Sequence, residues 1–304
     1  MRDADPLTDV LRLSDARCEW SGGFTAGGRW GLRFPRFEKM TFAVLVKGAC
    51  LLRIEGARRV LQICAGDVVL LSGQKGYDLL SDATIRPRDV QPLFDGSGFL
   101  RAGRGEDCVA LTGGVYVRPA SANLFVDVLP PLVLVRADAP TATALRWIVE
   151  QIAVERTSTL PGSAAATDQL AQLLFMQVLR AHIANSARAP AGWLRGIGDA
   201  QLVRALRVMH GDPARAWQLQ ELAEVASMSR TSFALHFKSV VGIAPLTYLT
   251  QWRMQLAVRA LREGTPIADI AAAVGYASES AFSHAFKRVV GTTPRAARLA
   301  EAAV

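Results

Sequence analysis

The sequence lacks any hydrophobic run long enough to cross a membrane. Half of its 304 residues are hydrophobic, yet no apolar stretch approaches the roughly 20 residues that a transmembrane helix needs. The N-terminal stretch MRDADPLTDVLRL is polar and acidic, so it does not have the apolar centre of a secretory signal peptide. We therefore expect a cytoplasmic protein with no membrane partner.

Cysteine and histidine are scarce, with four residues of each type. No two cysteines have CxxC spacing, so the common zinc-ribbon and dithiol redox motifs are absent. Every cysteine precedes residue 110 and every histidine follows it, which leaves no Ser-His-Asp or Cys-His arrangement in the first third of the chain. We expect no enzyme activity, no cofactor and no metal site. The cysteines are Cys18, Cys50, Cys64 and Cys108.

Acidic residues are fewer than basic ones, 27 against 35, which gives a net charge of +8. Residues 197–304 hold 12 basic and 8 acidic residues, half of the net charge in about a third of the chain. Excess positive charge suits a polyanionic partner such as nucleic acid. The C-terminal region is therefore the better candidate for contacting phosphate.

Short apolar or alternating segments predict a β-rich region over residues 1–136. Many short strands at close spacing are typical of a sandwich or barrel rather than of an α/β sheet. Residues 81–107 are rich in Gly, Pro and Arg and predict a long loop. The expected strands are residues 41–48, 50–56, 58–63, 67–72 and 108–117.

From about residue 140 the apolar residues recur with a helical period. Residues 142–156 and 167–184 predict two helices with wide apolar faces, which either complete the first domain or pair with a second chain in a homodimer. Residues 185–199 have the composition of a linker. We expect an α+β protein of two domains, a β-barrel with a helical segment in residues 1–195 and an all-α domain in residues 196–304.

One segment of the second domain occurs twice, as MSRTSFALHFKSVVG (228–242) and YASESAFSHAFKRVVG (276–291). Each copy follows a short apolar helix and a tight turn, and Ser229 or Ser278 is a suitable N-cap. Helix, turn and helix together form the DNA-binding bihelical unit. Two units joined by a helix over residues 247–264 can enter successive major grooves about 34 Å apart, so one chain can read a non-palindromic site.

These repeats carry a resemblance to a known family. LAEVASMSRTSFALHFKSVVGIAPLTYLTQWRM and IADIAAAVGYASESAFSHAFKRVVGTTPRAAR resemble the DNA-binding domain of the AraC/XylS transcription regulators, over about residues 200–298. The resemblance implies an all-helical domain with two helix-turn-helix motifs, and a regulator that binds double-stranded DNA. It favours an activator that works with RNA polymerase.

The resemblance also implies which positions contact DNA. Arginine often stands in the family where this chain has Leu235 and His284, so the bases read here are expected to differ: leucine suits a thymine methyl group, and histidine donates a single hydrogen bond. The base-contacting candidates are Arg230, Thr231, Ser232, Leu235, Glu279, Ser280, Ser283 and His284. The phosphate-contacting candidates are Ser229, Lys238, Ser278, Lys287 and Arg288.

The first domain resembles the cupin-type sensor domain found in a subgroup of that family, in WGLRFPRF (30–37) and AGDVVLLSG (65–73). Metal-binding cupins use histidines and a carboxylate, but the β-rich region has no histidine and Tyr77 stands where one would be expected. We therefore expect a sensor of a small organic effector. Its pocket candidates are Trp30, Arg33, Phe42, Tyr77 and Tyr116.

Two alternatives stay open. Cys18 and Cys108 are candidates for a thiol-based redox sensor on the same scaffold, because nearby cations raise thiol reactivity. Serine substitutions at these two positions distinguish that hypothesis, since an unchanged response to oxidant removes it. The other alternative is a cupin enzyme that its helical domain tethers to DNA, which stoichiometric iron or zinc would support.

Overall fold

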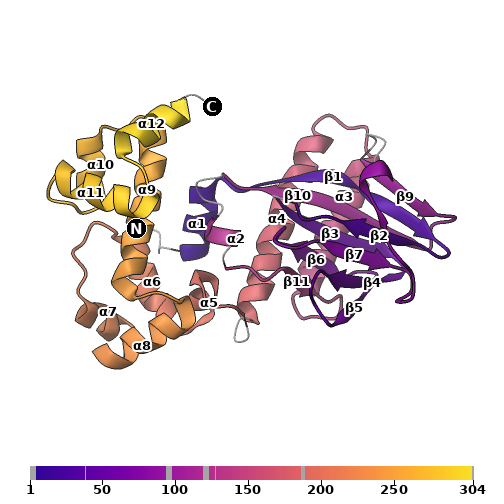
Figure 1. Ribbon diagram of the computed structural model, residues 1–304, viewed down its shortest axis with the longest axis horizontal. Helices are drawn as coiled ribbons and strands as arrows, with labels where there is room; N and C mark the ends of the chain where they lie inside the picture. The colour runs from indigo at the N-terminus through magenta and orange to yellow at the C-terminus, as the bar shows by residue number, and fades with distance from the viewer. Residues whose placement is uncertain are drawn as a thin grey trace. The chain divides into compact units, whose positions relative to one another are not determined.

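The computed structural model describes residues 5–37, 39–93, 98–118, 123–126, 128–185 and 189–302 (Figure 1). The chain forms two compact units, one of residues 16–185 and one that joins the first 15 residues to those from 186 onward. The first unit contains the sheets and the second is helical. The expected domain boundary at residue 195 remains a prediction. No helix among the described residues is long and apolar enough to span a membrane.

The sheet unit contains two sheets. The six-stranded sheet has the order β11-β6-β3-β10-β1-β9 and the five-stranded sheet has the order β5-β4-β7-β2-β8. The strands are β1 (Arg17–Gly27), β2 (Gly31–Phe34), β3 (Met40–Lys47), β4 (Ala49–Ile54), β5 (Val60–Cys64), β6 (Val68–Leu71), β7 (Tyr77–Leu80), β8 (Arg88–Asp89), β9 (Phe99–Gly103), β10 (Cys108–Tyr116) and β11 (Leu132–Val135).

All five strands expected from the apolar segments form, within a few residues of the expected bounds. No hydrogen-bonded pairing between described strands joins the two sheets, so the expected closed barrel is not confirmed. The expected loop over residues 81–107 is wrong in part. It contains β8 and β9, and β9 pairs in parallel with β1 from Gly23 opposite Phe99 to Gly27 opposite Gly103.

The interior of the sheet unit is apolar and is filled from both sheets, for example by Leu45 and Leu52.

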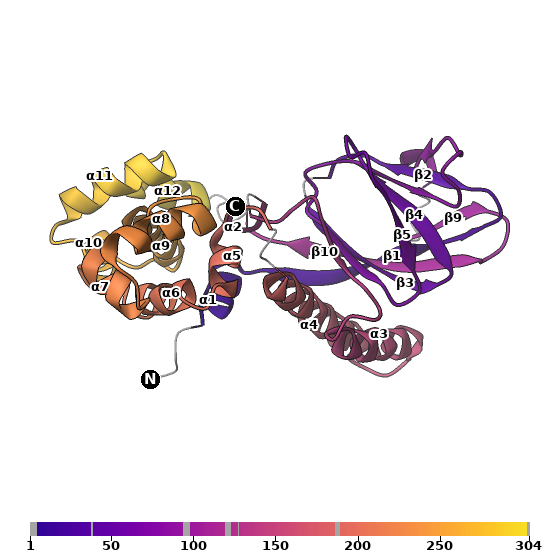
Figure 2. The same ribbon diagram turned by 90° about the horizontal axis from the view of Figure 1, so that it is seen from below.

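The β3–β4 turn at Gly48 needs glycine, because its φ is +78° and an added Cβ would lie 2.0 Å from the carbonyl oxygen of Asp107. Helix α4 packs along β1 and against α3 (Figure 2). The unit's helices are α2 (Asn123–Val126), α3 (Ala142–Thr157), α4 (Ser163–Ala184) and the 3-10 turn η1 (Gln91–Leu93).

The helical unit begins with the N-terminal helix α1, which packs against α5, α6 and α9. Asp5 caps α1 by accepting a hydrogen bond from the backbone N–H of Leu7, and Pro6 occupies its first position. The helices are α1 (Pro6–Ser14), α5 (Trp193–Gly198), α6 (Leu202–Gly211), α7 (Leu219–Val225), α8 (Arg230–Val241), α9 (Pro245–Arg262), α10 (Ile267–Ala273), α11 (Glu279–Val290) and α12 (Pro294–Ala302).

Candidate DNA-binding surface and sensor cleft

The two repeats fold into two helix-turn-helix units, α7 with α8 and α10 with α11 (Figure 1). Their turns are built alike. Ser227 and Gly275 have left-handed φ angles of +55° and +79°. The next residues, Met228 and Tyr276, donate backbone hydrogen bonds to Ala223 and Ala271. The second turn is one residue longer, as the sequence predicts.

Helices α8 and α11, the second helix of each unit and called the recognition helices below, begin and end in the same way. Ser229 Oγ accepts a hydrogen bond from the backbone N–H of Ser232, and Ser278 Oγ accepts one from Ala281, each at 3.2 Å. Gly242 and Gly291 end the two helices with left-handed backbone angles. The predicted serine N-caps are therefore confirmed.

The phenylalanines of the repeat lie inside and the polar positions lie outside. Phe233 and Phe237 on α8, with Phe282 and Phe286 on α11, are fully buried. Of the base-contacting candidates, Ser283 is half-buried and the others are exposed. Leu235 is 68% exposed, so its side chain is free to contact a base. The exposed candidates are Arg230, Thr231, Ser232, Leu235, Glu279, Ser280 and His284.

The phosphate-contacting candidates are all exposed as well. Lys238 lies in the last turn of α8, and Lys287 and Arg288 lie in the last turn of α11. The hydroxyl oxygens of Ser229 and Ser278 accept hydrogen bonds from their own helices, so their first role is structural. Each recognition helix thus presents polar side chains in its first turns and positive charge in its last turn.

Asp199 is a positioning residue that the sequence did not single out. One carboxylate oxygen accepts hydrogen bonds from the backbone N–H groups of Gln201 and Leu202 at the start of α6, and the other lies 2.7 Å from Nε2 of His236 on α8. Burial acts to raise the pKa of Asp199, but the hydrogen bonds from Leu202 and His236 outweigh it and lower the pKa. This carboxylate fixes the first recognition helix against α6.

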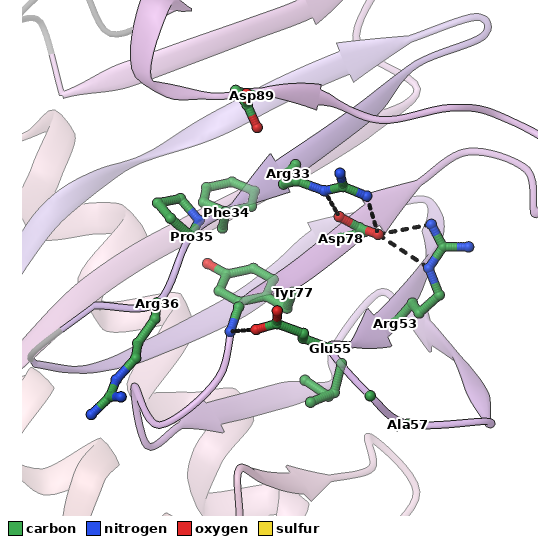
Figure 3. A pocket seen from close by; sticks show the side chains of 13 residues that line it. Arg33, Phe34, Pro35, Arg36, Arg53, Glu55, Ala57, Tyr77, Asp78 and Asp89 are labelled. Atoms are coloured by element: carbon green, nitrogen blue, oxygen red, sulfur yellow. Dashed lines mark hydrogen bonds and ion pairs between the residues drawn. The ribbon is translucent and has the colours of Figure 1, made fainter.

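A cleft of 630 Å³ opens on the five-stranded sheet (Figure 3). At one side Asp78 on β7 binds two cations from neighbouring strands, Arg33 Nε at 2.9 Å and Arg53 Nη2 at 2.7 Å. Burial acts to raise the pKa of Asp78, but the two guanidinium groups outweigh it and lower the pKa. Arg36, Glu55 and Asp89 add further charge to the lining, so the cleft is polar and holds both signs.

Phe34 and Tyr77 lie between this cleft and the interior of the sandwich. Their rings stack at a centroid distance of 4.6 Å and an interplanar angle of 7°. Both residues also line a small apolar cavity of 40 Å³ between the sheets, together with Leu52 and Val69. Burial raises the pKa of the Tyr77 phenol, so it stays protonated and able to donate a hydrogen bond.

Only two of the five predicted effector-pocket residues line the same cleft. Arg33 and Tyr77 line the cleft. Trp30 and Phe42 are buried, against Phe24 and Trp20 respectively, and do not line it. The exposed Tyr116 accepts a hydrogen bond from Lys39 Nζ at 3.1 Å. The aromatic candidates therefore divide between core, surface and cleft.

The two redox candidates lie far apart in the β1–β10 pair. Cys18 is opposite Val115, whereas Cys108 is opposite Ala26. Burial, with a smaller contribution from Asp168, raises the pKa of Cys18 to about 12, which makes its thiol unreactive. Cys108 is instead hydrogen-bonded to Cys50, and this contact lowers the pKa of Cys108 although burial opposes it.

Metal ligands do not gather in the described part of the chain, where no group of three or more His, Cys, Asp and Glu residues is placed to hold an ion. The sequence had suggested no cysteine pairing, because Cys50 and Cys108 are 58 residues apart and sit in strands of different sheets. In the structure Cys108 interacts with Cys50, a residue that the sequence did not single out as a redox candidate.

Comparison with known proteins matches both units. A cupin family model matches residues 5–184 and a helix-turn-helix domain model matches residues 222–300. A protein of Streptomyces antibioticus described as an AraC-like transcription regulator is 40% identical over 293 residues, which cover 95% of this chain and 97% of the relative. The transcriptional regulator AlkR of Acinetobacter baylyi is 31% identical, with 76% and 78% covered. The RCS-specific transcriptional activator RclR of Escherichia coli is 33% identical, with 69% and 75% covered.

Proposed function

This chain belongs to the AraC-like, DNA-binding transcription regulators with an N-terminal cupin domain, and from that premise we propose that α8 and α11 read one non-palindromic DNA site while the sheet unit senses a small organic effector. Such regulators are not enzymes. The protein acts in this proposal as an activator that contacts RNA polymerase, and a homodimer binds tandem sites more tightly through effective concentration.

The observation that carries the DNA-binding part is the similar construction of the two helix-turn-helix units. Each has a serine-capped recognition helix whose phenylalanines are buried and whose first turns expose short polar side chains. Side chains of this size reach base edges when the helix lies in the major groove. The basic residues in the last turns then lie near phosphates and supply affinity that depends on salt.

The exposed side chains suggest different base preferences for the two helices. Arg230 at the start of α8 can pair with guanine through two hydrogen bonds, and the exposed Leu235 provides an apolar contact for a thymine methyl group. On α11, Glu279 accepts a hydrogen bond from a cytosine amino group, and His284 donates one. The two half-elements of the site therefore differ in sequence, as a non-palindromic site requires.

The cleft beside Arg33 and Tyr77 supports the sensing part. Asp78 already binds Arg33 and Arg53, so the cations are held in place before a ligand arrives. Arg36 contributes a further guanidinium to the lining. The stacked Phe34 and Tyr77 rings offer an apolar surface beside these charges. An organic anion with a flat apolar part fits this combination.

The experiment for the DNA-binding part is selection of binding sites from genomic DNA with purified protein, read by sequencing at two salt concentrations. The expected result is a motif with two different half-elements about one helical turn apart. Thr231→Ala and Ser280→Ala each weaken binding to that motif by about 5-fold, because each removes one hydroxyl contact to a base edge worth about 1 kcal/mol.

Circular dichroism of the two variants is expected to match the wild type, since both side chains are exposed. Two results contradict the proposal. One is wild-type binding that depends on salt but selects no motif, which would make the domain a phosphate-binding tether. The other is wild-type affinity for the motif in both variants, which would remove the assignment of the base-contacting positions.

A second candidate signal is oxidation of the thiol pair, and the hydrogen bond between Cys50 and Cys108 favours it. Both cysteines are buried, so a peroxide must first reach the pair. It would then oxidise the Cys108 thiol to a sulfenic acid with loss of one water, and the Cys50 thiol would displace a second water to form the disulfide. Cys108→Ser is expected to abolish a response of DNA binding to peroxide and Cys18→Ser to preserve it. An unchanged response in Cys108→Ser removes the redox hypothesis.

A further inference from the structure

The loop between α6 and α7, residues 212–218, makes contacts that reach beyond its own helix-turn-helix unit. Arg253, at mid-length in α9, donates hydrogen bonds from Nε to the carbonyl oxygen of Pro213 at 2.6 Å and from Nη2 to that of Arg215 at 2.8 Å. Two backbone carbonyls of the loop are thereby held by one half-buried guanidinium. We call this segment the α6–α7 loop.

The same loop lies directly on the turn of the second helix-turn-helix unit. A Cβ added to Gly275 would lie 2.1 Å from the carbonyl oxygen of Ala214. Two features therefore require glycine at position 275: this close approach and its φ of +79°. The Arg253 guanidinium also lies over the ring of the next residue, Tyr276, at 6.0 Å. The loop, α9 and the second turn thus meet at one place.

The α6–α7 loop is held internally as well. The Arg215 guanidinium stacks on Trp217 at 4.1 Å and forms an ion pair with Glu221 on α7 at 2.7 Å. Trp217 Nε1 donates to the carbonyl oxygen of Asp212, and the Asp212 carboxylate accepts from the backbone N–H of Arg215. A displacement of the loop would have to break this set of contacts together, so the loop behaves as a stiff connection.

Helix α9 packs against both helix-turn-helix units. Tyr248, near its start, contacts Phe237 of the first unit at a ring distance of 5.8 Å. Met254 and Leu261, further along, belong to the apolar cluster that contains Phe282 and Phe286 of the second unit. Residue 253 lies between these two regions. The contact of the α6–α7 loop with Gly275 ties the units together at the point where α9 passes from one to the other.

We propose that Arg253, by holding the α6–α7 loop against the second turn, fixes the separation and rotation of the two recognition helices and so determines which spacing between half-elements the protein accepts. The proposal rests on the proposed function, in which α8 and α11 read one site together. Each added base pair moves the second half-element by about 3.4 Å and turns it by about 34°. A rigid pair of helices cannot follow that change, whereas a loosened pair can.

The test measures dissociation constants for the selected site and for three versions with one base pair removed, one added or two added between the half-elements. For the wild type, each one-base-pair change is expected to raise Kd by about 10-fold or more, because one half-element loses its contacts. Arg253→Gln, which shortens the side chain and removes the charge, is expected to reduce that penalty to about 3-fold or less.

Arg259→Gln is the matched control. Arg259 lies on the same helix, is half exposed and pairs with Glu263 within α9, so this variant is expected to keep the wild-type spacing penalty. Gly275→Ala attacks the contact from the other side, because its Cβ would push the loop away, and is expected to relax the penalty like Arg253→Gln. Thermal unfolding of each variant establishes that it is folded at the temperature of the binding assay.

Three outcomes overturn the proposal. The first is an Arg253→Gln protein that retains the wild-type penalty for every spacing. The second is a variant whose Kd rises by the same factor on all four DNAs, which is what a purely structural loss of stability produces. The third is a wild-type protein that selects a two-part motif but binds all spacings equally. Absence of any two-part motif in the wild type would instead overturn the proposed function, and the role of Arg253 with it.

Discussion

At the scale of single residues, His210 is a buried titratable group of the helical unit. Its ring stacks on Trp252 at 3.8 Å, Nε2 accepts a hydrogen bond from the Tyr248 hydroxyl at 2.8 Å and Nδ1 lies 3.3 Å from Asp9 on α1. Burial lowers the pKa of His210 below 6.5, although Asp9 and, more weakly, Asp5 act to raise it. We therefore assign a neutral ring that donates to Asp9.

This environment predicts how stability depends on pH. Because the folded pKa of His210 is lowered, the unfolded chain takes up a proton below about pH 6.5 that the folded protein does not. The stabilising contribution is present above pH 6.5 and is lost as the pH falls below it, by at most about 1.4 kcal/mol per pH unit. Denaturant unfolding of wild type and His210→Gln between pH 5 and 8 measures it.

The His210→Gln protein is expected to lose less stability between pH 6.5 and pH 5 than the wild type. It is also expected to be less stable at pH 8, because the stacking on Trp252 is weakened. Equal pH slopes in the two proteins would show that His210 takes up its proton equally well in the folded and unfolded states.

At the scale of elements, the two recognition helices depend on the same local device, a serine N-cap. Ser229→Ala and Ser278→Ala each leave a backbone N–H without its acceptor and are expected to lower the unfolding free energy by about 1 kcal/mol, whereas glycine at either position costs only a few tenths. Urea denaturation measures this. Ser280→Ala, an exposed serine inside α11 that caps nothing, is the control and is expected to change stability by less than about 0.5 kcal/mol.

The two caps are independent enough to test whether their effects on the unfolding free energy add. Ser229 and Ser278 belong to different helix-turn-helix units and share no hydrogen-bond partner in the described structure, so the double alanine variant is expected to lose the sum of the two single losses. A double variant that is no less stable than either single one would mean that one helix frays before the other contributes to the measured transition.

Elements with a local signal were predictable, and elements that depend on distant partners were not. The serine caps, the turns and the paired phenylalanines of α8 and α11 each depend on residues within about 15 positions of one another. The sequence therefore predicted where they lie. Strand β9 was missed because its parallel pairing with β1 joins residues about 75 apart. Helix α1 was not predicted although Asp5 and Pro6 form a helix N-terminal signal, because the residues that cover its apolar face lie in α5, α6 and α9, far along the chain.

At the scale of the whole molecule, the exposure of the DNA-binding candidates could be predicted from the sequence, whereas the lining of the candidate sensor cleft could be predicted only in part. Exposure of Arg230 or Ser280 follows from helical periodicity alone. Whether Phe42 on β3, or Trp30 in the connection between β1 and β2, faces a cleft or the core depends on how the strands pair into sheets, and no local pattern fixes that. Arg33 and Tyr77 line the same cleft because they lie on the neighbouring strands β2 and β7; their role in binding an effector stays a prediction.

Helix α1 belongs to the helical unit although it is the first element of the chain and precedes every strand. Asp9 and its partner His210 are 201 residues apart in sequence. At the usual rates of protein synthesis, α1 therefore leaves the ribosome roughly 10 to 40 seconds before its binding surface has been made. During that interval the apolar face formed by Leu7, Val10 and Leu13 has none of its native partners, because α5, α6 and α9 have not yet been translated.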